Sequence, residues 1–422
     1  MSRWLYHALL CCAFPLIFLY LLKRSKRQST YRQHWRERLG FYASTPNNGP
    51  LIWLHAVSVG ETRATAPLIT ALKTAYPQHR FLISCMTPTG RATAQELFAE
   101  FAEIVYLPYD YPGAVGRFLE HFRPGFGVLM ETEIWPNLIH GCADRNMPLF
   151  LANARLSEKS LKGYLKIGSL IKPAVARLAG VLAQSEMDAT RLKQLGSSNT
   201  HIVGNIKFDN LPDENAIAHG LSWRYNFGSR NVLLFASSRD GEEALLLDAL
   251  ANWPESLLLI LVPRHPQRFD EVATLLEHRS LKVLKRSTWD ESPLSKEVQV
   301  LLGDSMGEMI RYYTASDLAI IGGSILPFGS QNLIEACALG TPVLLGPSTY
   351  NFSQAAIEAI TCHAAWQGED IHAIIQQAMY LLAHAEERKV MGQAGKTFAS
   401  AHRGATQKLL SYLPPAAKKP RS

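Results

Sequence analysis

Short apolar runs alternate with amphipathic stretches along most of this 422-residue chain. In the first half, near-continuous apolar runs predict seven strands, at residues 51–57, 80–85, 104–108, 126–130, 149–154, 181–185 and 201–205. The stretches between them, such as TRATAPLITALKTAY, have helical patterns. Apolar strands that alternate with helices are typical of a parallel sheet covered on both faces. The first half therefore predicts a Rossmann-like α/β domain.

A second series of the same kind follows an interruption. Residues 209–230 (DNLPDENAIAHGLSWRYNFGSR) are polar and irregular, which predicts a linker. Five further apolar runs predict strands at 231–237, 257–263, 298–303, 318–323 and 342–347. The expected parts are an N-terminal segment at 1–27, a Rossmann-like domain at 28–208, the linker, a second Rossmann-like domain at 231–400, and a C-terminal helix or tail at 401–422.

The first residues of the chain depart from this alternation. Residues 5–22 (LYHALLCCAFPLIFLYLL) are apolar, and eighteen helical residues rise about 27 Å, enough for a thin bilayer core. A signal peptide is the alternative, but no A-x-A-like cleavage site follows. A dense basic block follows instead, and basic residues stay on the cytoplasmic side. The sequence predicts a single-pass or deeply inserted membrane anchor, with residues 23–422 in the cytoplasm.

The net charge of +7 is concentrated beside this segment. The basic flank Lys23–Arg38 holds seven Lys or Arg and one Glu, and Arg3 and the KKPR tail add further positive charge. The rest of the chain is slightly acidic, so nucleic-acid binding has little support, whereas the flank would attract anionic lipid headgroups. Six scattered cysteines, without CxxC or zinc spacing, indicate reduced thiols and no structural metal.

A carboxylate stands at the end of the first predicted strand, in LHAVSVGETRA. Glu61 follows Gly60 at the point where a helix begins. An acidic residue there stabilises the helix, which is the structural interpretation. In open α/β sheets, however, ligands bind beyond the carboxyl ends of the strands, so Glu61 is also a candidate catalytic base.

Other polar groups follow other strands of the first half. METEIWPN places Glu131 and Glu133 directly after a strand, and NARLSEKS supplies Arg155 and Ser157 after the next. Several polar clusters on one edge of a sheet are hard to explain as separate helix caps. We therefore expect them to line a crevice together.

The second half has its densest polar signal in IIGGSILPFGSQNLIEACALGTPVLLGP. A strand ends at Gly322, Gly323 and Ser324, and a helix is expected near 331–339, whose first backbone N–H groups could bind phosphate. Asn332 and Glu335 share one face of that helix, where a Glu can accept hydrogen bonds from ribose hydroxyls. A tight turn with Asn332 and Glu335 as a capping pair is the structural alternative.

Three further strand ends carry candidate ligand contacts. They are Ser237 and Ser238 in ASSRDGEE, Arg264 and His265 in PRHPQRF, and Met306, Gly307 and Glu308 in GDSMGEM. An arginine fork suits a diphosphate-like or carboxylate group, although Arg264 could equally form a surface ion pair. The chain has no GxGxxG after either first strand and no P-loop, which disfavours a dinucleotide oxidoreductase.

Seven motifs follow one another along the chain in a recognisable order. SVGE, METEIWPN, NARLSEKS, GNIKFD, PRHPQRF, GDSMGEM and GGS…N..E.CALGTPVLLGP, behind an N-terminal anchor, resemble the Kdo (3-deoxy-D-manno-octulosonic acid) transferases of lipopolysaccharide synthesis. The resemblance runs from the anchor to about residue 400. It implies an α/β GT-B glycosyltransferase architecture, in which two Rossmann-like domains face a cleft and bind the acceptor and the donor respectively.

The resemblance also implies a reaction and assigns residues to it. An inverting, metal-independent transferase without a cofactor would move Kdo from CMP-Kdo to the lipid A precursor (lipid IVA) at the cytoplasmic face of the inner membrane. The catalytic base falls on Glu61, and Glu131, Glu133, Arg155 and Ser157 lie on the acceptor side. The donor-binding residues would be Ser237, Ser238, Arg264, His265, Met306, Gly307, Glu308, Gly322, Gly323, Ser324, Asn332 and Glu335.

The chain departs from the family pattern on the donor side. Arg239 and Asp240 stand in SSRDGEE, where the family usually has a His or another aromatic ring. Gln331 replaces the His, and Ala336 the Pro, of a GGHNPLEP pattern. Glu61 and the METEIWPN cluster are intact.

Other functions fit parts of the same pattern. One is another GT-B transferase that uses a UDP-sugar on a lipid acceptor. A nucleotide-sugar epimerase shares the two-domain fold but needs no membrane anchor. A membrane-tethered nucleotide-sugar binding protein would not need Glu61 for turnover.

Overall fold

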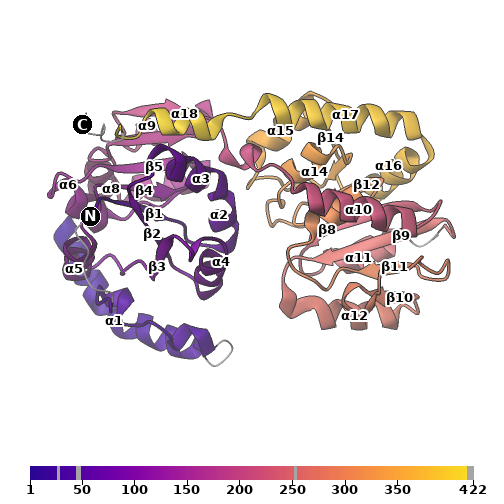
Figure 1. Ribbon diagram of the computed structural model, residues 1–422, viewed down its shortest axis with the longest axis horizontal. Helices are drawn as coiled ribbons and strands as arrows, with labels where there is room; N and C mark the ends of the chain where they lie inside the picture. The colour runs from indigo at the N-terminus through magenta and orange to yellow at the C-terminus, as the bar shows by residue number, and fades with distance from the viewer. Residues whose placement is uncertain (26–28, 44–48, 251–253, 416–422) are drawn as a thin grey trace. The chain divides into compact units, whose positions relative to one another are not determined.

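The computed structural model describes residues 1–25, 29–43, 49–250 and 254–415 (Figure 1). The chain divides into two compact units, Met1–Asn210 with Gly404–Ser422, and Leu211–Arg403. Residues 26–28 of the predicted basic flank and 416–422 of the predicted tail lie outside the described residues.

The first unit is built on a parallel sheet of seven strands. Its order is β3-β2-β1-β4-β5-β6-β7. The strands are β1 (Leu51–His55), β2 (Arg80–Cys85), β3 (Ala102–Tyr106), β4 (Phe126–Met130), β5 (Leu149–Ala154), β6 (Gly180–Ala183) and β7 (Thr200–Ile202). All seven predicted strands are confirmed to within a few residues. The strand order reverses between β1 and β4, and ligands of such sheets bind at this switch point.

Helices cover both faces of this sheet (Figure 1). Along β1, Trp53 packs on one side with the apolar faces of α5, α6 and α8, whereas Ile52 and Leu54 pack on the other with α3, α4 and α18, because successive strand side chains point to opposite faces. The helices are α2 (Val59–Ala64), α3 (Ala66–Ala75), α4 (Pro88–Phe98), α5 (Pro112–Phe122), α6 (Pro136–Ala143), α7 (Glu158–Lys166), α8 (Gly168–Val175), α9 (Glu186–Gln194) and α18 (Ala405–Ser411).

Helix α18 comes from the far end of the chain yet completes the core of the first unit. Ala405 and Leu409 are buried with the α3 side of the sheet. The Asp209 carboxylate accepts hydrogen bonds from the backbone N–H groups of Gly404 and Thr406, both at 2.6 Å. The segment where the chain leaves the first unit is therefore tied directly to the segment where it returns.

The second unit has its own parallel sheet of seven strands, in the order β10-β11-β9-β8-β12-β13-β14. The strands are β8 (Asn231–Ser238), β9 (Leu257–Pro263), β10 (Val283–Lys285), β11 (Val300–Leu302), β12 (Leu318–Ile321), β13 (Val343–Leu345) and β14 (Ala365–Gln367). The five predicted strands are confirmed. The edge strands β10 and β14 were not predicted, because each has three residues and neither stands out as an apolar run.

The predicted linker at 209–230 differs from the structure, because Glu214–Asn226 form helix α10 of the second unit. Asp213 caps it by accepting a hydrogen bond from the Asn215 backbone N–H at 3.1 Å. Trp223 is fully buried, but most of the other helix positions are polar, which hid the helical pattern. The other helices are α11 (Glu242–Ala249), α12 (Phe269–His278), α13 (Met309–Thr314), α14 (Ile334–Leu339), α15 (Ser353–Thr361), α16 (Ile371–Ala383) and α17 (Ala385–Ala401).

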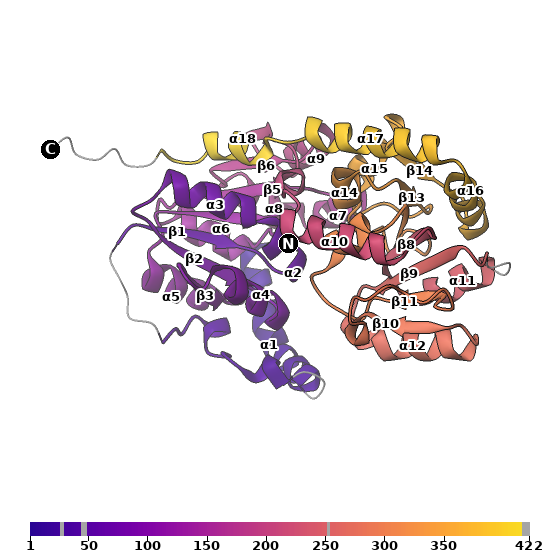
Figure 2. The same ribbon diagram turned by 45° about the vertical axis from the view of Figure 1, so that its right-hand side comes forward.

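The N-terminal helix α1 (Arg3–Ser25) is long and apolar enough to cross a membrane. It is the long helix labelled α1 in Figure 2. One side of its first half is bonded to the rest of the first unit, where the Tyr6 hydroxyl donates to Asp110 Oδ2 at 3.1 Å and the Tyr111 hydroxyl donates to the Leu10 carbonyl at 2.7 Å. Other positions expose apolar side chains, namely Leu5, Leu9, Leu16 and Leu19. The helix could therefore anchor the protein in a membrane while it remains attached to the rest of the first unit.

Candidate active site

Glu61 lies in the short helix α2, which begins just beyond the carboxyl end of β1. One carboxylate oxygen accepts a hydrogen bond from the Val57 backbone N–H at 2.8 Å, and the other accepts from the Ser58 hydroxyl at 3.1 Å. Ser58 in turn caps the helix by accepting from the Glu61 backbone N–H at 3.5 Å. The motif SVGE thus resembles a capping box, with the Val57 N–H in place of the N-cap N–H, and it holds the carboxylate in one orientation.

The pKa of Glu61 is raised to about 7. Burial is the main cause, and the negative charges of Glu131 and Glu133 add to it, against the opposing hydrogen bonds from Val57 and Ser58. A general base works best when its pKa lies near the working pH. Glu61 is therefore suited to accept a proton near neutral pH.

Glu131 is the buried centre of an ion-pair cluster. Its backbone has φ of +61°, a left-handed conformation for a residue directly after β4. Its carboxylate accepts from Arg155 Nε and from Lys207 Nζ, both at 2.9 Å. Burial alone would raise the pKa of Glu131, but Lys207 and Arg155 outweigh it and hold the pKa below its usual value. Glu131 is thus the ionised carboxylate beside Glu61.

Glu133 is held differently, by rings instead of cations. It accepts a hydrogen bond from Trp135 Nε1 at 2.6 Å, and His55 Nε2 lies 3.9 Å away. Burial raises the pKa of Glu133, and the Glu131 charge adds to this. His55 is fully buried at the end of β1, and burial lowers its pKa to about 4. Its Nδ1 lies 3.0 Å from the Ser84 carbonyl, whereas its Nε2 has no hydrogen-bond partner among the described residues.

These groups come together at the switch point of the first sheet. Glu61 follows β1, and Glu131 and Glu133 follow β4, its neighbour. Arg155 joins them from the loop after β5. Ser157 instead caps α7, where its hydroxyl accepts from the Ser160 backbone N–H at 3.1 Å. The arrangement places the Glu61 carboxylate, a base of raised pKa, near the fixed cations Arg155 and Lys207. Glu61 can therefore deprotonate a bound hydroxyl.

In the second unit, a buried glutamate organises the glycine loop after β12. Glu242 is fully buried and accepts backbone hydrogen bonds from Gly323 at 2.6 Å, Ile325 at 3.0 Å and Leu326 at 3.1 Å. It also accepts from the Arg239 backbone N–H at 2.8 Å. Backbone amides of this loop therefore face Glu242, because a buried N–H group must find an acceptor.

The predicted residues Gly322, Gly323 and Ser324 shape this loop. Gly323 has φ of +70°, and a side chain at Gly322 would collide with the Ser237 backbone. Ser324 is fully buried and its hydroxyl accepts from the Gly346 backbone N–H at 2.8 Å. Ser324 therefore joins the ends of β12 and β13 from within the fold.

The end of β8 and the residues that follow β8 and β9 bring cations together. Ser238 is buried and donates to Glu243 at 2.6 Å, while Ser237 has φ of +58°. Arg239 Nη1 lies 3.2 Å from His265 Nε2. Burial lowers the pKa of His265, and the charges of Arg239, Arg264 and Arg268 lower it further.

Two residues that depart from the family pattern contact the predicted donor residues. Arg264 Nε donates to Gln331 Oε1 at 3.1 Å. Arg239 contacts His265, as described above, and lies 4.7 Å from the Phe328 ring centre. Arg239 therefore adds a cation to a set that can attract an anionic donor.

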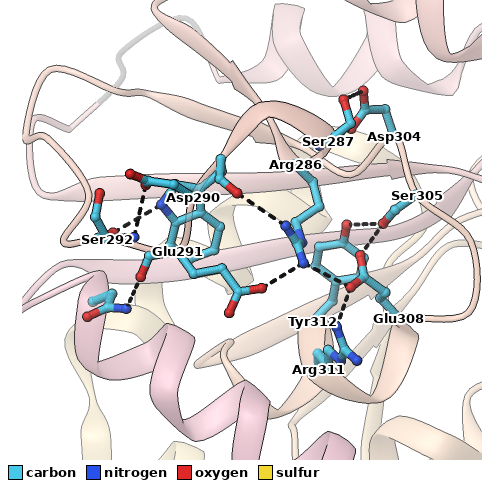
Figure 3. A network of polar contacts seen from close by, with 12 residues as sticks. Arg286, Ser287, Asp290, Glu291, Ser292, Asp304, Ser305, Glu308, Arg311 and Tyr312 are labelled. Carbon is cyan, nitrogen blue, oxygen red and sulfur yellow. Dashed lines mark hydrogen bonds and ion pairs between the residues drawn. The ribbon is translucent and has the colours of Figure 1, made fainter.

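The motif GDSMGEM forms a braced loop after β11 (Figure 3). Glu308 pairs with Arg286 at 3.1 Å and with Arg311 at 2.5 Å, and it also accepts from the Ser305 hydroxyl. The Glu308 carboxylate thus stabilises the loop through contacts within the second unit. Met306 is 54% exposed and Gly307 is exposed as well, so these two residues are the accessible part of the loop.

Asn332 and Glu335 form the expected pair at the start of α14. Asn332 Nδ2 donates to Glu335 Oε1 at 2.9 Å, and Asn332 Oδ1 accepts from the Ile334 backbone N–H at 3.0 Å. The capping alternative therefore describes their geometry, and it leaves the Glu335 carboxylate partly exposed.

Three residues of these clusters were not singled out from the sequence. Lys207 stands in GNIKFD and Glu242 in SSRDGEE, so both lie in recognisable motifs, each just after a predicted strand. His55 was hidden in an apolar strand, where a lone polar residue was the only signal. Among the described residues, no group of three His, Cys, Asp or Glu side chains is placed to hold a metal ion.

Known proteins match the chain over nearly its full length. A family model described as 3-deoxy-D-manno-octulosonic-acid transferase (kdotransferase) matches residues 33–210, and one described as glycosyl transferases group 1 matches 281–398. The 3-deoxy-D-manno-octulosonic acid transferase of Bordetella pertussis is 40% identical over 98% of this chain and 99% of its own. That of Haemophilus influenzae is 36% identical over the same shares.

The fold is also shared with solved structures. A glycosyltransferase from Rickettsia africae covers 87% of this chain and 98% of its own, with a TM-score of 0.59 at 15% identity. The predicted GT-B architecture is thereby confirmed. The identity of 40% and 36% to the two bacterial relatives shows the family of the chain as well as its fold. The chain belongs to the 3-deoxy-D-manno-octulosonic acid transferase family, the glycosyltransferases that transfer Kdo in lipopolysaccharide synthesis.

Proposed function

We propose that this protein is an inverting transferase that moves Kdo from CMP-Kdo to the lipid A precursor, lipid IVA, with Glu61 as general base. The observation that carries the proposal is the Glu61 carboxylate, which is held by the Val57 N–H and the Ser58 hydroxyl at the switch point with its pKa raised to about 7. Family membership supports Kdo as the transferred sugar.

The proposed step is a single displacement. A hydroxyl oxygen of the acceptor sugar attacks the anomeric carbon of Kdo while its proton passes to Glu61. The bond between that carbon and the CMP phosphate oxygen breaks, and its electron pair leaves with CMP. General-base assistance of this kind typically contributes about 10²- to 10⁴-fold.

The second unit is proposed to bind the donor. CMP-Kdo carries a phosphate and a carboxylate, and Arg239 and Arg264 beside His265 form a cationic set that suits both anions. The exposed part of the GDSMGEM loop, Met306 and Gly307, is available to the nucleotide. The Glu335 carboxylate can accept from ribose hydroxyls.

The reaction is proposed to take place at the cytoplasmic face of the inner membrane, where a lipid acceptor is available. Helix α1 could provide the anchor, and the basic flank at 23–38 supports a cytoplasmic orientation. Attachment of α1 to the first unit supports a position of that unit next to the lipid surface.

The test is transfer from CMP-Kdo to a tetra-acylated lipid A precursor, with products counted by mass spectrometry. Wild type is expected to add Kdo, and Glu61→Gln to lose turnover while CMP still protects it against thermal unfolding. An inactive wild type that is protected by UDP and not by CMP would refute the proposed donor. A Glu61→Gln variant as active as wild type would refute the proposed base.

A further inference from the structure

A cavity of about 770 Å³ lies in the first unit and shares no lining residue with the Glu61 cluster. Its walls come from residues 32–43 and from one side of α5. The first wall includes the short 3-10 helix η2 (Glu37–Leu39) and directly follows another, η1 (Ser29–Arg32). The volume is in the range of sites that hold small ligands, about 300–1,000 Å³.

Three arginines line this cavity, Arg32, Arg36 and Arg117, and all three side chains are exposed. Arg117 is held in place because its Nε and Nη2 donate to the Leu39 carbonyl at 3.1 and 2.6 Å. Arg36 and Arg117 also lie over the Phe41 ring, 5.8 and 4.3 Å from its centre. Their guanidinium groups are thus gathered around one aromatic ring.

The two carboxylates of the cavity wall are already matched by other cations. Glu37 pairs with Arg91 and accepts from the Tyr106 backbone N–H at 2.8 Å, and His34 Nδ1 lies 3.1 Å from it. Glu120 pairs with Arg145 at 3.1 Å. The three cavity arginines therefore leave the space with net positive charge, which favours an anion.

The remaining wall is aromatic. Trp35 Nε1 donates to the Tyr31 carbonyl at 2.6 Å, and the Tyr42 hydroxyl donates to the Tyr106 carbonyl at 3.0 Å. Because the polar ends of these side chains are bonded within the fold, their rings supply apolar surface to the cavity. An anion with an attached apolar group fits such walls better than a small inorganic ion.

The cavity is coupled to the end of the apolar helix α1. Arg32 Nε donates to the hydroxyl of Ser25, the last residue of α1, at 3.0 Å. Arg24 Nη1 donates to the Tyr31 hydroxyl at 2.8 Å. Basic residues at the end of an apolar span lie at the level of the lipid headgroups. With α1 in the membrane, as proposed above, the cavity lies close to the phosphates of membrane lipids.

We propose that this cavity binds the phosphate-bearing headgroup of an anionic membrane lipid, with Arg36 and Arg117 contacting the phosphate. Arginine forks bind phosphate oxygens in pairs, and the aromatic wall contacts the glycerol and first acyl carbons. This inference rests on the proposed membrane insertion of α1 but not on the proposed transfer reaction, because no residue of the Glu61 cluster takes part.

The test uses the full-length protein in a neutral detergent. Dioctanoyl phosphatidic acid, dioctanoyl phosphatidylcholine and inorganic phosphate are each titrated in by calorimetry. Wild type is expected to bind phosphatidic acid at least tenfold more tightly than the other two. The variant Arg36→Gln/Arg117→Gln is expected to bind phosphatidic acid at least tenfold more weakly.

The matched control, Arg123→Gln/Lys193→Gln, removes two exposed positive charges of the same unit outside the cavity and is expected to bind like wild type. Unchanged affinity in Arg36→Gln/Arg117→Gln would overturn the proposal, as would inorganic phosphate or phosphatidylcholine binding as tightly as phosphatidic acid. If the double variant does not fold, the two single variants replace it, and unchanged affinity in both would overturn the proposal.

A last arm separates a bulk lipid from the sugar-transfer acceptor, which is also a phosphorylated lipid under the proposed function. Arg36→Gln/Arg117→Gln is expected to keep the wild-type KM for the tetra-acylated precursor within twofold. A tenfold rise in that KM with unchanged binding of phosphatidic acid would assign the cavity to the acceptor and overturn the proposal.

Discussion

Ser58 and Glu61 hold each other at the start of α2. The Ser58 hydroxyl donates to the Glu61 carboxylate at 3.1 Å, and the same oxygen accepts from the Glu61 backbone N–H at 3.5 Å. The structural and the catalytic interpretations of Glu61 are therefore compatible, because the cap that stabilises the helix also orients the carboxylate. Removal of either side chain should separate the two roles.

Replacement of Glu61 by Gln is expected to lower kcat by about 10²- to 10⁴-fold, because the side chain keeps its shape but cannot take up a proton. CMP binding should be unchanged, since the predicted donor residues belong to the second unit. Steady-state kinetics and thermal shift with CMP measure the two quantities. Glu133→Gln is the matched control, and a larger loss there than in Glu61→Gln would move the base to Glu133.

The pH dependence should report the pKa of Glu61. Since a base must be deprotonated, kcat is expected to rise with pH and level off above about 7, the pKa to which burial and Glu131 raise Glu61. The acid limb should vanish from the residual rate of Glu61→Gln. A wild-type profile that is flat between pH 5.5 and 8 would contradict the assignment.

The same raised pKa has a consequence for stability. The folded state binds the Glu61 proton more tightly than the unfolded state, so stability from this group is present at low pH and is lost as pH rises through about 7. The melting temperature of wild type should therefore fall relative to Glu61→Gln between pH 5 and 8. A difference that is constant with pH would show that Glu61 titrates normally.

Ser58→Ala is expected to cost about 0.5–2 kcal/mol of stability through the lost cap. It should also shift the acid limb of the rate profile to higher pH, because the Ser58 hydrogen bond lowers the Glu61 pKa. Asp370→Ala is the matched control, since Asp370 caps α16 of the second unit by accepting from Ala373 at 2.8 Å. Asp370→Ala should lose stability and leave the rate profile unshifted.

Lys207→Gln is expected to destabilise the first unit, because Glu131 is only 6% exposed and would lose one of its two cations. Breaking a buried ion pair costs about 3–5 kcal/mol, and the remaining Arg155 should keep the loss near the lower end. In the double variant Glu131→Gln/Lys207→Gln, the buried negative charge of Glu131 is removed together with its Lys207 partner. Urea unfolding should give a smaller loss for this double variant than the sum of the single losses, and strict additivity would argue against direct coupling.

Glu242→Gln is expected to raise the KM for the donor about tenfold or more and to leave the KM for the acceptor unchanged. The Gln side chain has an NH₂ group, a hydrogen-bond donor, where Glu242 has its second carboxylate oxygen. Backbone N–H groups of the 323–326 loop that now bond to that oxygen would be left without an acceptor. Asp317→Asn is the matched control, because Asp317 accepts from the Val232 backbone N–H at the opposite end of the same sheet. An equal rise in donor KM in both variants would indicate general loosening of the unit.

The sequence was most informative where apolar runs were long. It predicted twelve of the fourteen strands in the described part of the chain and the gathering of Glu61, Glu131 and Arg155, because parallel strands end at one edge of a sheet. It did not reveal α10, whose one fully buried large side chain is Trp223, or strands of three residues at the sheet edges.

Contacts between distant segments were beyond its reach. Lys207 meets Glu131 across 76 positions, and Glu242 meets the loop after β12 across more than 80. Such pairings depend on strand order, which the local pattern of apolar residues does not specify.

The return of α18 to the first unit bears on the order of events during synthesis. Multidomain chains usually fold from the N-terminus as they leave the ribosome. Here the first unit lacks Ala405 and Leu409 until nearly the whole chain has been made. Both ends of the second unit lie within the chain, so the second unit can fold before α18 has been synthesised and the core of the first unit is complete. A premature stop codon just after residue 403 would therefore destabilise the first unit, which loses α18, more than the second unit, which keeps all its residues.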